Sequence, residues 1–352
     1  MKMKSRILLI LMTLALASCD GNSGSNDVDP TQKDFQYWNT CEALTSLKQF
    51  VETTSKQGEH YIPVEDRVAV FDMDGTFYGE LFPTYLEYVM YEYRVLDDPT
   101  YKDKASEEEI TFAQEIRAGV HNNSYPSGTD MRHANLAAKA YAGMSLKEFD
   151  DYAKAFLKKD IPLFQNLTYG DAFYTPMLEV FDYLHANSYQ VYVVSGSDRF
   201  LIRSLLDDKL DIPANRIIGM DVRVEATGQG ETAGVGYQYQ LTDDILRTDE
   251  LLIKNLKFNK VAQIVQEIGK QPVLSFGNSG GDQAMHLYTL NKNQYDSAAF
   301  MLVADDAERD YTYLSEEKIN SLNTQWSDLG FHVVSMKNDF KTIYGENVKK
   351  AA

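Results

Sequence analysis

Residues 68–76 read Val-Ala-Val-Phe-Asp-Met-Asp-Gly-Thr, and this stretch decides the fold. Its first four residues are apolar, which is typical of a short strand that is buried on both faces. Two carboxylates, Asp72 and Asp74, and a glycine follow at once. Acidic side chains at the end of a buried strand repel each other unless a cation or a reaction holds them there. Because ligands bind at the carboxyl ends of parallel strands, we predict a functional site here, with a plain turn as the alternative.

Four further apolar runs have the length of buried strands. Helical patterns separate most of them, so the sequence predicts an α/β fold with a doubly wound parallel sheet. Besides the first run, the predicted strands cover residues 191–194, 217–220, 273–276 and 300–303. Segments 221–226 and 236–241 flank a glycine-rich stretch, which favours a hairpin between them.

A long insertion follows the first predicted strand. No buried strand is evident between residues 80 and 171. The segments with helical spacing are 82–95, 107–118 and 146–158. We therefore predict an inserted helical domain at 80–171, and an α/β core made of residues 35–79 and 172–352.

The run from Asp72 to Thr76 resembles the first motif of the haloacid dehalogenase superfamily, and three further motifs of that family follow in order. Residues 190–198 read Gln-Val-Tyr-Val-Val-Ser-Gly-Ser-Asp, a strand that ends in a hydroxyl, Ser195, as in the second motif. Residues 272–285 read Pro-Val-Leu-Ser-Phe-Gly-Asn-Ser-Gly-Gly-Asp-Gln-Ala-Met and resemble the fourth motif. The third motif has one lysine before a helix, where this chain has Lys254, Lys257 and Lys260.

The resemblance covers roughly residues 66–345 and is closest to the phosphoserine phosphatase-like branch, which includes phosphorylcholine phosphatase-like members. It implies a haloacid dehalogenase-like core, with the inserted helices as a cap that closes over the site. It also implies Mg²⁺-dependent hydrolysis of small organic phosphate monoesters through an aspartyl-phosphate. Asp72 would be the nucleophile, and Asp74 would be the general acid and base.

The resemblance also implies a set of metal ligands. They are the Asp72 carboxylate, the Asp74 backbone carbonyl, and Asn278 or Asp282. The family has an acid where this chain has Asn278. An amide oxygen is a hard ligand without a charge, so we expect weaker metal binding. The departure leaves open a catalytically weak binding protein, and phosphoryl transfer to an acceptor other than water is a further alternative.

Three residues are implied for phosphate binding. Ser195 would hydrogen-bond a phosphoryl oxygen, and Gly196 would let the backbone approach it. Lys260 opens a helical stretch where the family places its lysine, with Lys257 and then Lys254 as alternatives.

The insertion offers two kinds of substrate contact. In phosphoserine phosphatases an acid and a cap arginine hold the amine and the carboxylate of the substrate, which would be Glu80 and Arg132 here. Both are otherwise ordinary surface charges. Aromatic faces can instead hold a quaternary ammonium, although aromatic side chains at helical spacing also form cores. The tyrosines concerned are Tyr85, Tyr88, Tyr91, Tyr93, Tyr125 and Tyr141.

The first 18 residues have the composition of a signal peptide. Lys2, Lys4 and Arg6 precede an apolar run of 11 residues, shorter than the about 20 residues that a membrane-spanning helix needs. The run ends in Leu-Ala-Ser-Cys, which resembles a bacterial lipoprotein cleavage site and implies lipidation of Cys19. Residues 19–34 are polar and predict a flexible tether. We expect an exported protein anchored at the bacterial cell envelope, with an ordinary secreted protein as the alternative.

The formal charge of −18 excludes two classes of partner. Nucleic acid and anionic lipid headgroups repel so acidic a surface. We therefore expect a small phosphorylated metabolite as the partner, and a lipid anchor as the only link to the membrane. Local cations must outweigh the overall charge for a phosphate ester to bind.

Overall fold

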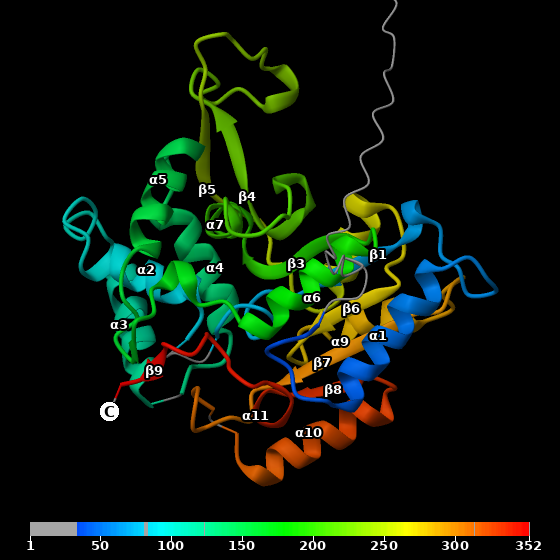
Figure 1. Cartoon of the computed structure of the whole chain (residues 1–352). Helices are drawn as coiled ribbons and strands as arrows, with labels where there is room; N and C mark the ends of the chain where they lie inside the picture. The colour runs from blue at the N-terminus through cyan, green and yellow to red at the C-terminus, as the bar shows by residue number, and fades with distance from the viewer. Residues whose placement is uncertain (1–33, 81–83, 123, 313, 352) are drawn as a thin grey trace, which may run out of the picture.

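The computed structural model describes residues 34–80, 84–122, 124–312 and 314–351, which form an α/β core with a helical insertion (Figure 1). Within these residues a seven-stranded sheet has the order β5-β4-β3-β1-β6-β7-β8. Its strands are β1 (Val68–Phe71), β3 (Gln190–Asp198), β4 (Ile217–Ala226), β5 (Ile245–Ile253), β6 (Leu274–Gly277), β7 (Ala298–Val303) and β8 (His332–Ser335). Neighbouring strands are parallel except β4 and β5. The predicted parallel α/β fold is confirmed, with one antiparallel edge strand.

Strand β1 lies at the centre of the sheet, between β3 and β6. Its side chains alternate between the two faces. Val68 and Val70 pack in one cluster with Met285, whereas Ala69 and Phe71 belong to the larger cluster on the other face. All four side chains are buried, as expected for a strand that is covered on both sides.

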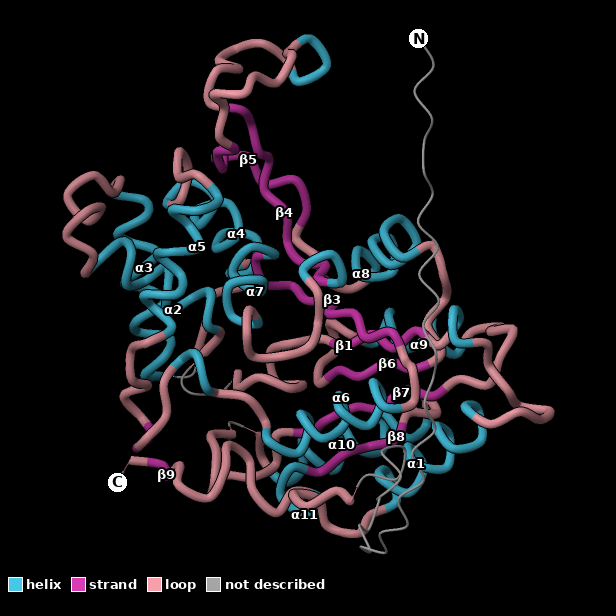
Figure 2. The backbone as a smooth tube through the Cα atoms, turned by 45° about the horizontal axis from the view of Figure 1, so that its top comes forward, coloured by secondary structure: helices cyan, strands magenta, loops and turns pink. Residues whose placement is uncertain are grey.

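Helices cover both faces of the sheet (Figure 2). The helices of the core are α1 (Glu42–Ser55), α6 (Thr175–Ala186), α7 (Arg199–Leu206), α8 (Phe258–Gln263), α9 (Gln283–Leu290), α10 (Glu316–Asp328) and α11 (Met336–Asp339). Apolar side chains of α1 and α6 join the cluster that contains Phe71. Helix α9 packs on the other face, and Trp326 of α10 packs against β7. This layering leaves the carboxyl end of β1 as the place where the chain can build a site.

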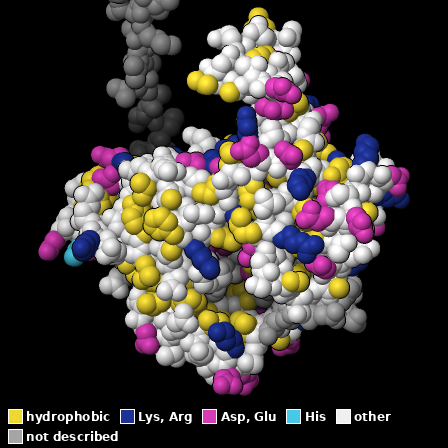
Figure 3. Space-filling model, turned by 180° about the vertical axis from the view of Figure 1, so that it is seen from behind, with side chains coloured by type: hydrophobic (Ala, Val, Ile, Leu, Met, Phe, Trp, Pro, Cys, Tyr) yellow, Lys and Arg dark blue, Asp and Glu magenta, His cyan; other side chains and the backbone are white. Residues whose placement is uncertain are grey.

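Strands β4 and β5 form a hairpin that projects from the body of the molecule (Figure 1). Its predicted first arm, 221–226, is part of β4, but the predicted second arm, 236–241, is wrong. That segment lies in the connection, where the Asp243 carboxylate accepts hydrogen bonds from Tyr237 and from the backbone of Gln240. Local polar contacts therefore replace strand pairing there. Figure 3 shows apolar side chains on this projection, and Val235 and Leu241 are fully exposed.

The insertion after β1 is helical and lies on one side of the core (Figure 1). Its helices are α2 (Leu86–Leu96), α3 (Glu107–Asn122), α4 (Thr129–Ala140) and α5 (Leu146–Leu157). Helix α4 is not among the helices predicted from the sequence. It begins after Gly128, whose backbone has a left-handed conformation. The domain boundaries at residues 80 and 171 stay a prediction. In the described ranges no helix has the length and apolar character needed to cross a membrane.

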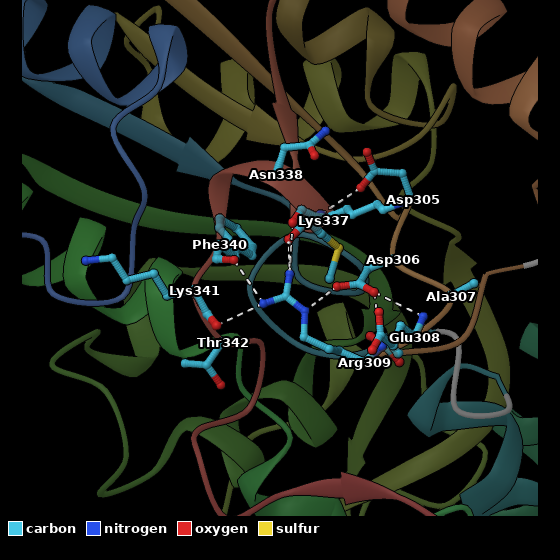
Figure 4. A network of polar contacts seen from close by, with 12 residues as sticks. Asp305, Asp306, Ala307, Glu308, Arg309, Lys337, Asn338, Phe340, Lys341 and Thr342 are labelled. Carbon is cyan, nitrogen blue, oxygen red and sulfur yellow. Dashed lines mark hydrogen bonds and ion pairs between the residues drawn. The ribbon is translucent and has the colours of Figure 1, made fainter.

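Two contacts hold the C-terminal segment. Its strand β9 (Lys349–Lys350) pairs with β2 (Phe164–Gln165), which comes after α5 in the chain. The Arg309 guanidinium forms an ion pair with Asp306 and donates to four backbone carbonyls near α11 at 2.9 to 3.1 Å (Figure 4). The carbonyl oxygens are those of Met336, Lys337, Phe340 and Lys341. One side chain thus satisfies acceptors that would otherwise lack donors.

Replacing Arg309 should destabilise the fold. Arg309→Lys is expected to lower the free energy of unfolding by about 2 kcal/mol, because a lysine cannot donate to four carbonyls and an ion pair at once. Urea unfolding would measure the loss. Arg223→Lys is a matched control, since Arg223 is exposed and pairs only at the surface with Glu250. Equal midpoints for wild type and Arg309→Lys would contradict the expected role.

Candidate active site

The two predicted carboxylates lie at the carboxyl end of β1, in the turn that follows it. Asp72 and Asp74 are 7% and 6% exposed. The Asp72 N–H donates to the carbonyl oxygen of Phe276 in β6 at 2.9 Å, so the pairing of β1 with β6 continues up to the first carboxylate. Gly75 has a φ of +76°, which turns the chain directly after Asp74.

Lys260 of α8 joins the carboxylates of Asp72 and Asp282. Its Nζ donates to Asp72 Oδ1 at 2.5 Å and to Asp282 Oδ1 at 2.6 Å. All three side chains are buried. Burial and the charge of Asp282 raise the pKa of Asp72 to about 7, although Lys260 opposes this shift. Two carboxylates therefore converge on a single buried cation.

Asp74 stands beside this cluster in a different environment. The Ser197 hydroxyl donates to Asp74 Oδ2 at 2.6 Å. Asp74 Oδ1 is buried and has no hydrogen-bond partner among the described residues. Burial, followed by the charge of Asp72, raises the pKa of Asp74 well above its usual value. Burial beside a second carboxylate thus favours the protonated form of Asp74 more than it would for an exposed aspartate.

The turn after β6 places Asn278 and Asp282. Asp282 Oδ2 accepts the backbone N–H groups of Asn278 at 3.1 Å and Ser279 at 3.0 Å, and its Oδ1 accepts Lys260. Both carboxylate oxygens of Asp282 are thus fixed. The Asn278 side chain donates through Nδ2 to Glu80 Oε2 at 2.5 Å.

A cavity of about 180 Å³ opens on these groups. One wall comes from the core and the other from the insertion, so a ligand would be enclosed between the two. Lys254 Nζ donates to Glu87 Oε1 at 2.6 Å and links the walls. The core lining is Asp72, Asp74, Gly196, Ser197, Lys254, Leu256, Lys257, Lys260, Asn278, Ser279, Gly281 and Asp282, and the insertion supplies Tyr85, Glu87, Tyr88 and Asp130.

The structure brings most of the predicted residues together at this cavity. Among the three candidate lysines only Lys260 contacts both carboxylates, because Lys254 pairs with Glu87 and the exposed Lys257 lies at the cavity wall. The roles of these residues in catalysis and binding stay predictions. Of the six tyrosines, Tyr85 and Tyr88 line the cavity.

Three predicted residues do not line the cavity. Ser195 is completely buried, and its hydroxyl accepts the Ser197 N–H at 3.1 Å, since the end of β3 is irregular and turns the side chain inward. Arg132 Nη1 donates to Glu115 at 2.5 Å, and its guanidinium lies over the Phe112 ring. Glu80 lies behind Asn278, to which it is hydrogen-bonded. The three side chains therefore lie outside the cavity lining, and their expected contacts with substrate and phosphate stay predictions.

Several lining residues were not predicted from the sequence. Ser197 is two residues after Ser195 in the same Ser-Gly-Ser turn. The motif therefore predicted the correct segment, but not which of its two serines lines the cavity. Glu87 and Asp130 come from the insertion, whose sequence gave no sign of which face meets the core.

The donor atoms at the site suit a metal that prefers oxygen. No group of three or more His, Cys, Asp or Glu side chains in the described ranges has the geometry of a metal site. The implied ligand set does not need one, because it combines two carboxylates with an amide and a backbone carbonyl. The two carboxylates of Asp72 and Asp282, which converge on one buried cation, supply the hard oxygen donors that suit Mg²⁺.

The chain belongs to the haloacid dehalogenase-like hydrolase family, whose model matches residues 69–286. The match includes the carboxylates after β1, the end of β3, Lys260 and the turn after β6. A comparison with curated protein sequences gives no match.

One solved structure with a TM-score above 0.5 shows the same fold at low sequence identity, and two others have lower TM-scores. A conserved protein of unknown function from Anaerococcus prevotii has a TM-score of 0.51 at 16% identity, over 90% of this chain and 100% of that one. A cytosolic 5′-nucleotidase IIIB bound to cytidine has a TM-score of 0.47 at 12% sequence identity, and the match covers 84% of this chain and 87% of that one. A phosphoserine phosphohydrolase-like protein from Francisella tularensis has a TM-score of 0.39 at 12% sequence identity, and the match covers 76% of this chain and 94% of that one.

Proposed function

We propose that this hydrolase is a Mg²⁺-dependent phosphatase that cleaves small organic phosphate monoesters through an aspartyl-phosphate on Asp72. The observation that carries the proposal is Lys260, held between Asp72 and Asp282 at the end of β1, with Asp74 beside them and hydrogen-bonded by Ser197. Transfer of a phosphoryl group needs a nucleophile, a proton donor and nearby positive charge. Asp72, Asp74 and Lys260 would supply these three within one small cavity.

Four residues would hold the metal in this proposal. They are Asp72, Asp282 and Asn278 through their side chains and Asp74 through its backbone carbonyl, and water would complete the shell. When bound, Mg²⁺ offsets the repulsion between the Asp72 carboxylate and the anionic ester. Lys260 adds a second positive charge that the protein carries itself.

In the proposed reaction Asp72 acts as the nucleophile and Asp74 as the acid and then the base. An oxygen of Asp72 bonds to phosphorus while the bond from phosphorus to the ester oxygen breaks, and Asp74 gives its proton to that oxygen. The alcohol then leaves. Asp74, now a carboxylate, takes a proton from water, whose oxygen attacks the phosphorus and releases phosphate from Asp72. The Ser197 hydroxyl holds Asp74 in position during both steps.

The cavity wall that the insertion forms favours a substrate with a cationic leaving group. Tyr85 and Tyr88 line it with Glu87 and Asp130. Asp130 accepts the Tyr88 hydroxyl at 2.7 Å and has no ion pair with a lysine or arginine in the described part of the chain. A cation over a tyrosine ring in a site without water gains about 2 kcal/mol. Because Arg132 pairs elsewhere, an amino acid carboxylate has less support than an ammonium group.

A panel of phosphate esters tests the proposal. Phosphocholine, phosphoserine and a sugar phosphate would be assayed with and without Mg²⁺. We expect turnover only with Mg²⁺, and a kcat/KM for phosphocholine about tenfold or more above the others, since ~1.4 kcal/mol is tenfold. No turnover of any ester with Mg²⁺ would overturn the phosphatase. Equal rates on all three would overturn only the preference for a cation.

Asn278 favours a second candidate, a catalytically weak binding protein. It stands where the family has an acid, and an uncharged ligand lowers the affinity for Mg²⁺. Such a protein would bind the ester in the same panel without releasing phosphate. Binding measured by calorimetry alongside phosphate release separates the two candidates.

We also propose that the protein is exported and lipid-anchored, on sequence features at residues 1–33, which lie outside the described residues. Cys19→Ala should move the protein from the detergent phase to the aqueous phase in a phase-separation assay, because the acyl chains would be lost. Cys41→Ala is the matched control and should stay with detergent, since Cys41 lies at the start of α1. Equal partitioning of wild type and Cys19→Ala would refute the anchor.

A further inference from the structure

Glu80 and Asn278 form a pair that joins the turn after β1 to the turn after β6. Glu80 Oε2 accepts the Asn278 Nδ2 at 2.5 Å across 198 positions of sequence. Tyr85, which lines the catalytic cavity, also hydrogen-bonds Glu80. The Glu80 carboxylate is therefore fixed from two sides.

Asn278 separates Glu80 from the catalytic cavity. Asn278 lines that cavity together with Asp72 and Asp282, and it also lines a neighbouring cavity of about 260 Å³. Glu80 lines only the second of these. A substrate in the catalytic cavity would meet the amide of Asn278 and not the Glu80 carboxylate.

The absence of a side chain at Gly75 makes room for the hydrogen bond between Glu80 and Asn278. A Cβ on Gly75 would lie 1.9 Å from Asn278 Nδ2 and 2.2 Å from Glu80 Oε2. The pair therefore packs directly on the turn that carries Asp72 and Asp74. This position ties the amide to the same backbone that places the two acids.

The hydrogen bond decides which atom of the amide faces the cavity. Glu80 Oε2 accepts the hydrogen bond from Nδ2, so the carboxyl group engages the NH₂ group of Asn278. Oδ1 is bonded to the same planar carbon and points away from Glu80. Without this partner the amide could rotate and present its NH₂ group, which would repel a cation.

We infer that Glu80 is a positioning residue for the metal site: its hydrogen bond to Nδ2 orients the Asn278 amide so that Oδ1 faces the part of the catalytic cavity where Mg²⁺ would bind. The inference rests on the proposed Mg²⁺-dependent function. It explains how the turn after β6 can carry an amide where the family has an acid. Partners that orient metal ligands typically change metal affinity by about 10–100-fold when they are removed.

Calorimetric titration of Mg²⁺ into the full-length protein, without substrate, tests the inference. Glu80→Gln should raise the Kd for Mg²⁺ about tenfold or more. The exchange Glu80→Gln with Asn278→Asp should restore a Kd close to wild type, because the carboxylate and the amide trade places and the same hydrogen bond forms in reverse. Glu179→Gln is the matched control and should bind like wild type, since Glu179 is buried outside the cavity and accepts two backbone N–H groups.

The outcomes separate this inference from the proposed function. If wild type binds no Mg²⁺, the Mg²⁺-dependent function and the inference both fail. If wild type and Glu80→Gln bind Mg²⁺ equally, only the inference fails, as it does if the exchange variant binds as weakly as Glu80→Gln. Should Glu80→Gln not fold, Glu80→Asp keeps the charge and shortens the side chain, and a wild-type Kd for it would overturn the orienting role.

Discussion

Asp72→Asn should abolish turnover while the protein stays folded. An amide does not attack phosphorus, and it does not carry the charge that a bound cation would balance. Loss of the nucleophile should lower kcat by at least about 10⁴-fold, since single catalytic groups that act as one unit cost up to about 10⁶-fold in other hydrolases. Steady-state assays on the best ester of the panel would measure this.

The fold should tolerate the Asp72→Asn change for a local reason. Lys260 keeps its second partner, Asp282, at 2.6 Å, so its charge stays paired. The variant also removes a buried carboxylate that burial and Asp282 already disfavour, as its raised pKa shows. We therefore expect a thermal midpoint close to that of the wild type.

Asp310→Asn is the matched control for the loss of a buried carboxyl group. Asp310 is also buried, accepts the Tyr344 hydroxyl at 2.8 Å and lies outside the catalytic cavity. It should leave kcat near the wild-type value. A folded Asp72→Asn protein that retains a substantial part of the activity would exclude Asp72 as the nucleophile.

The sequence predicted the centre of the fold because its signals there are local. Residues 68–71 are apolar in a row, as a strand covered on both faces requires, and the charges follow within the same short stretch. The edge strands lack that signal. Residues 245–253 read Ile-Leu-Arg-Thr-Asp-Glu-Leu-Leu-Ile, with a polar and charged run in the middle, and β8 has four residues at the edge of the sheet. Only pairing with distant segments makes them strands.

The same limit applies to the site. Asp72, Asp74 and Asp282 were visible as acids that follow apolar runs. Which hydroxyl meets the cavity depended on an irregular end of β3, where the register shifts between Val194 and Asp198, and so Ser197 faces it instead of Ser195. No local pattern records such a shift.

Side chains from the insertion were harder still to place. The ion-pair partner of a charged side chain often comes from a distant segment, so it becomes known only from the tertiary structure. Arg132 pairs with Glu115 on the neighbouring helix, although its chemistry alone suited a substrate carboxylate. Glu80 similarly meets Asn278 through the tertiary fold. The sequence thus shows which charged residues are present, but only the tertiary structure shows which group each of them contacts.

Asp74→Asn should slow the enzyme by an amount that depends on the leaving group. For an alkyl phosphate, whose alkoxide needs a proton to leave, we expect kcat to fall by about 10²–10⁴-fold, the usual contribution of general acid–base catalysis. For p-nitrophenyl phosphate the first step should be nearly unaffected, because nitrophenolate leaves without a proton. The backbone carbonyl that would serve as a metal ligand is unchanged, so the Kd for Mg²⁺ should stay near the wild-type value.

The second step gives the sharper test, because the variant also lacks the base that activates water. Rapid mixing with p-nitrophenyl phosphate should release a burst of nitrophenolate that matches the enzyme concentration, followed by slow turnover as the aspartyl-phosphate accumulates on Asp72. Ser197→Ala, which removes the 2.6 Å hydrogen bond to Asp74 but keeps the acid, should give a smaller loss on the alkyl ester. An equal fall on both esters, without a burst, would mean that Asp74 transfers no proton. The raised pKa of Asp74 would then report only burial beside Asp72.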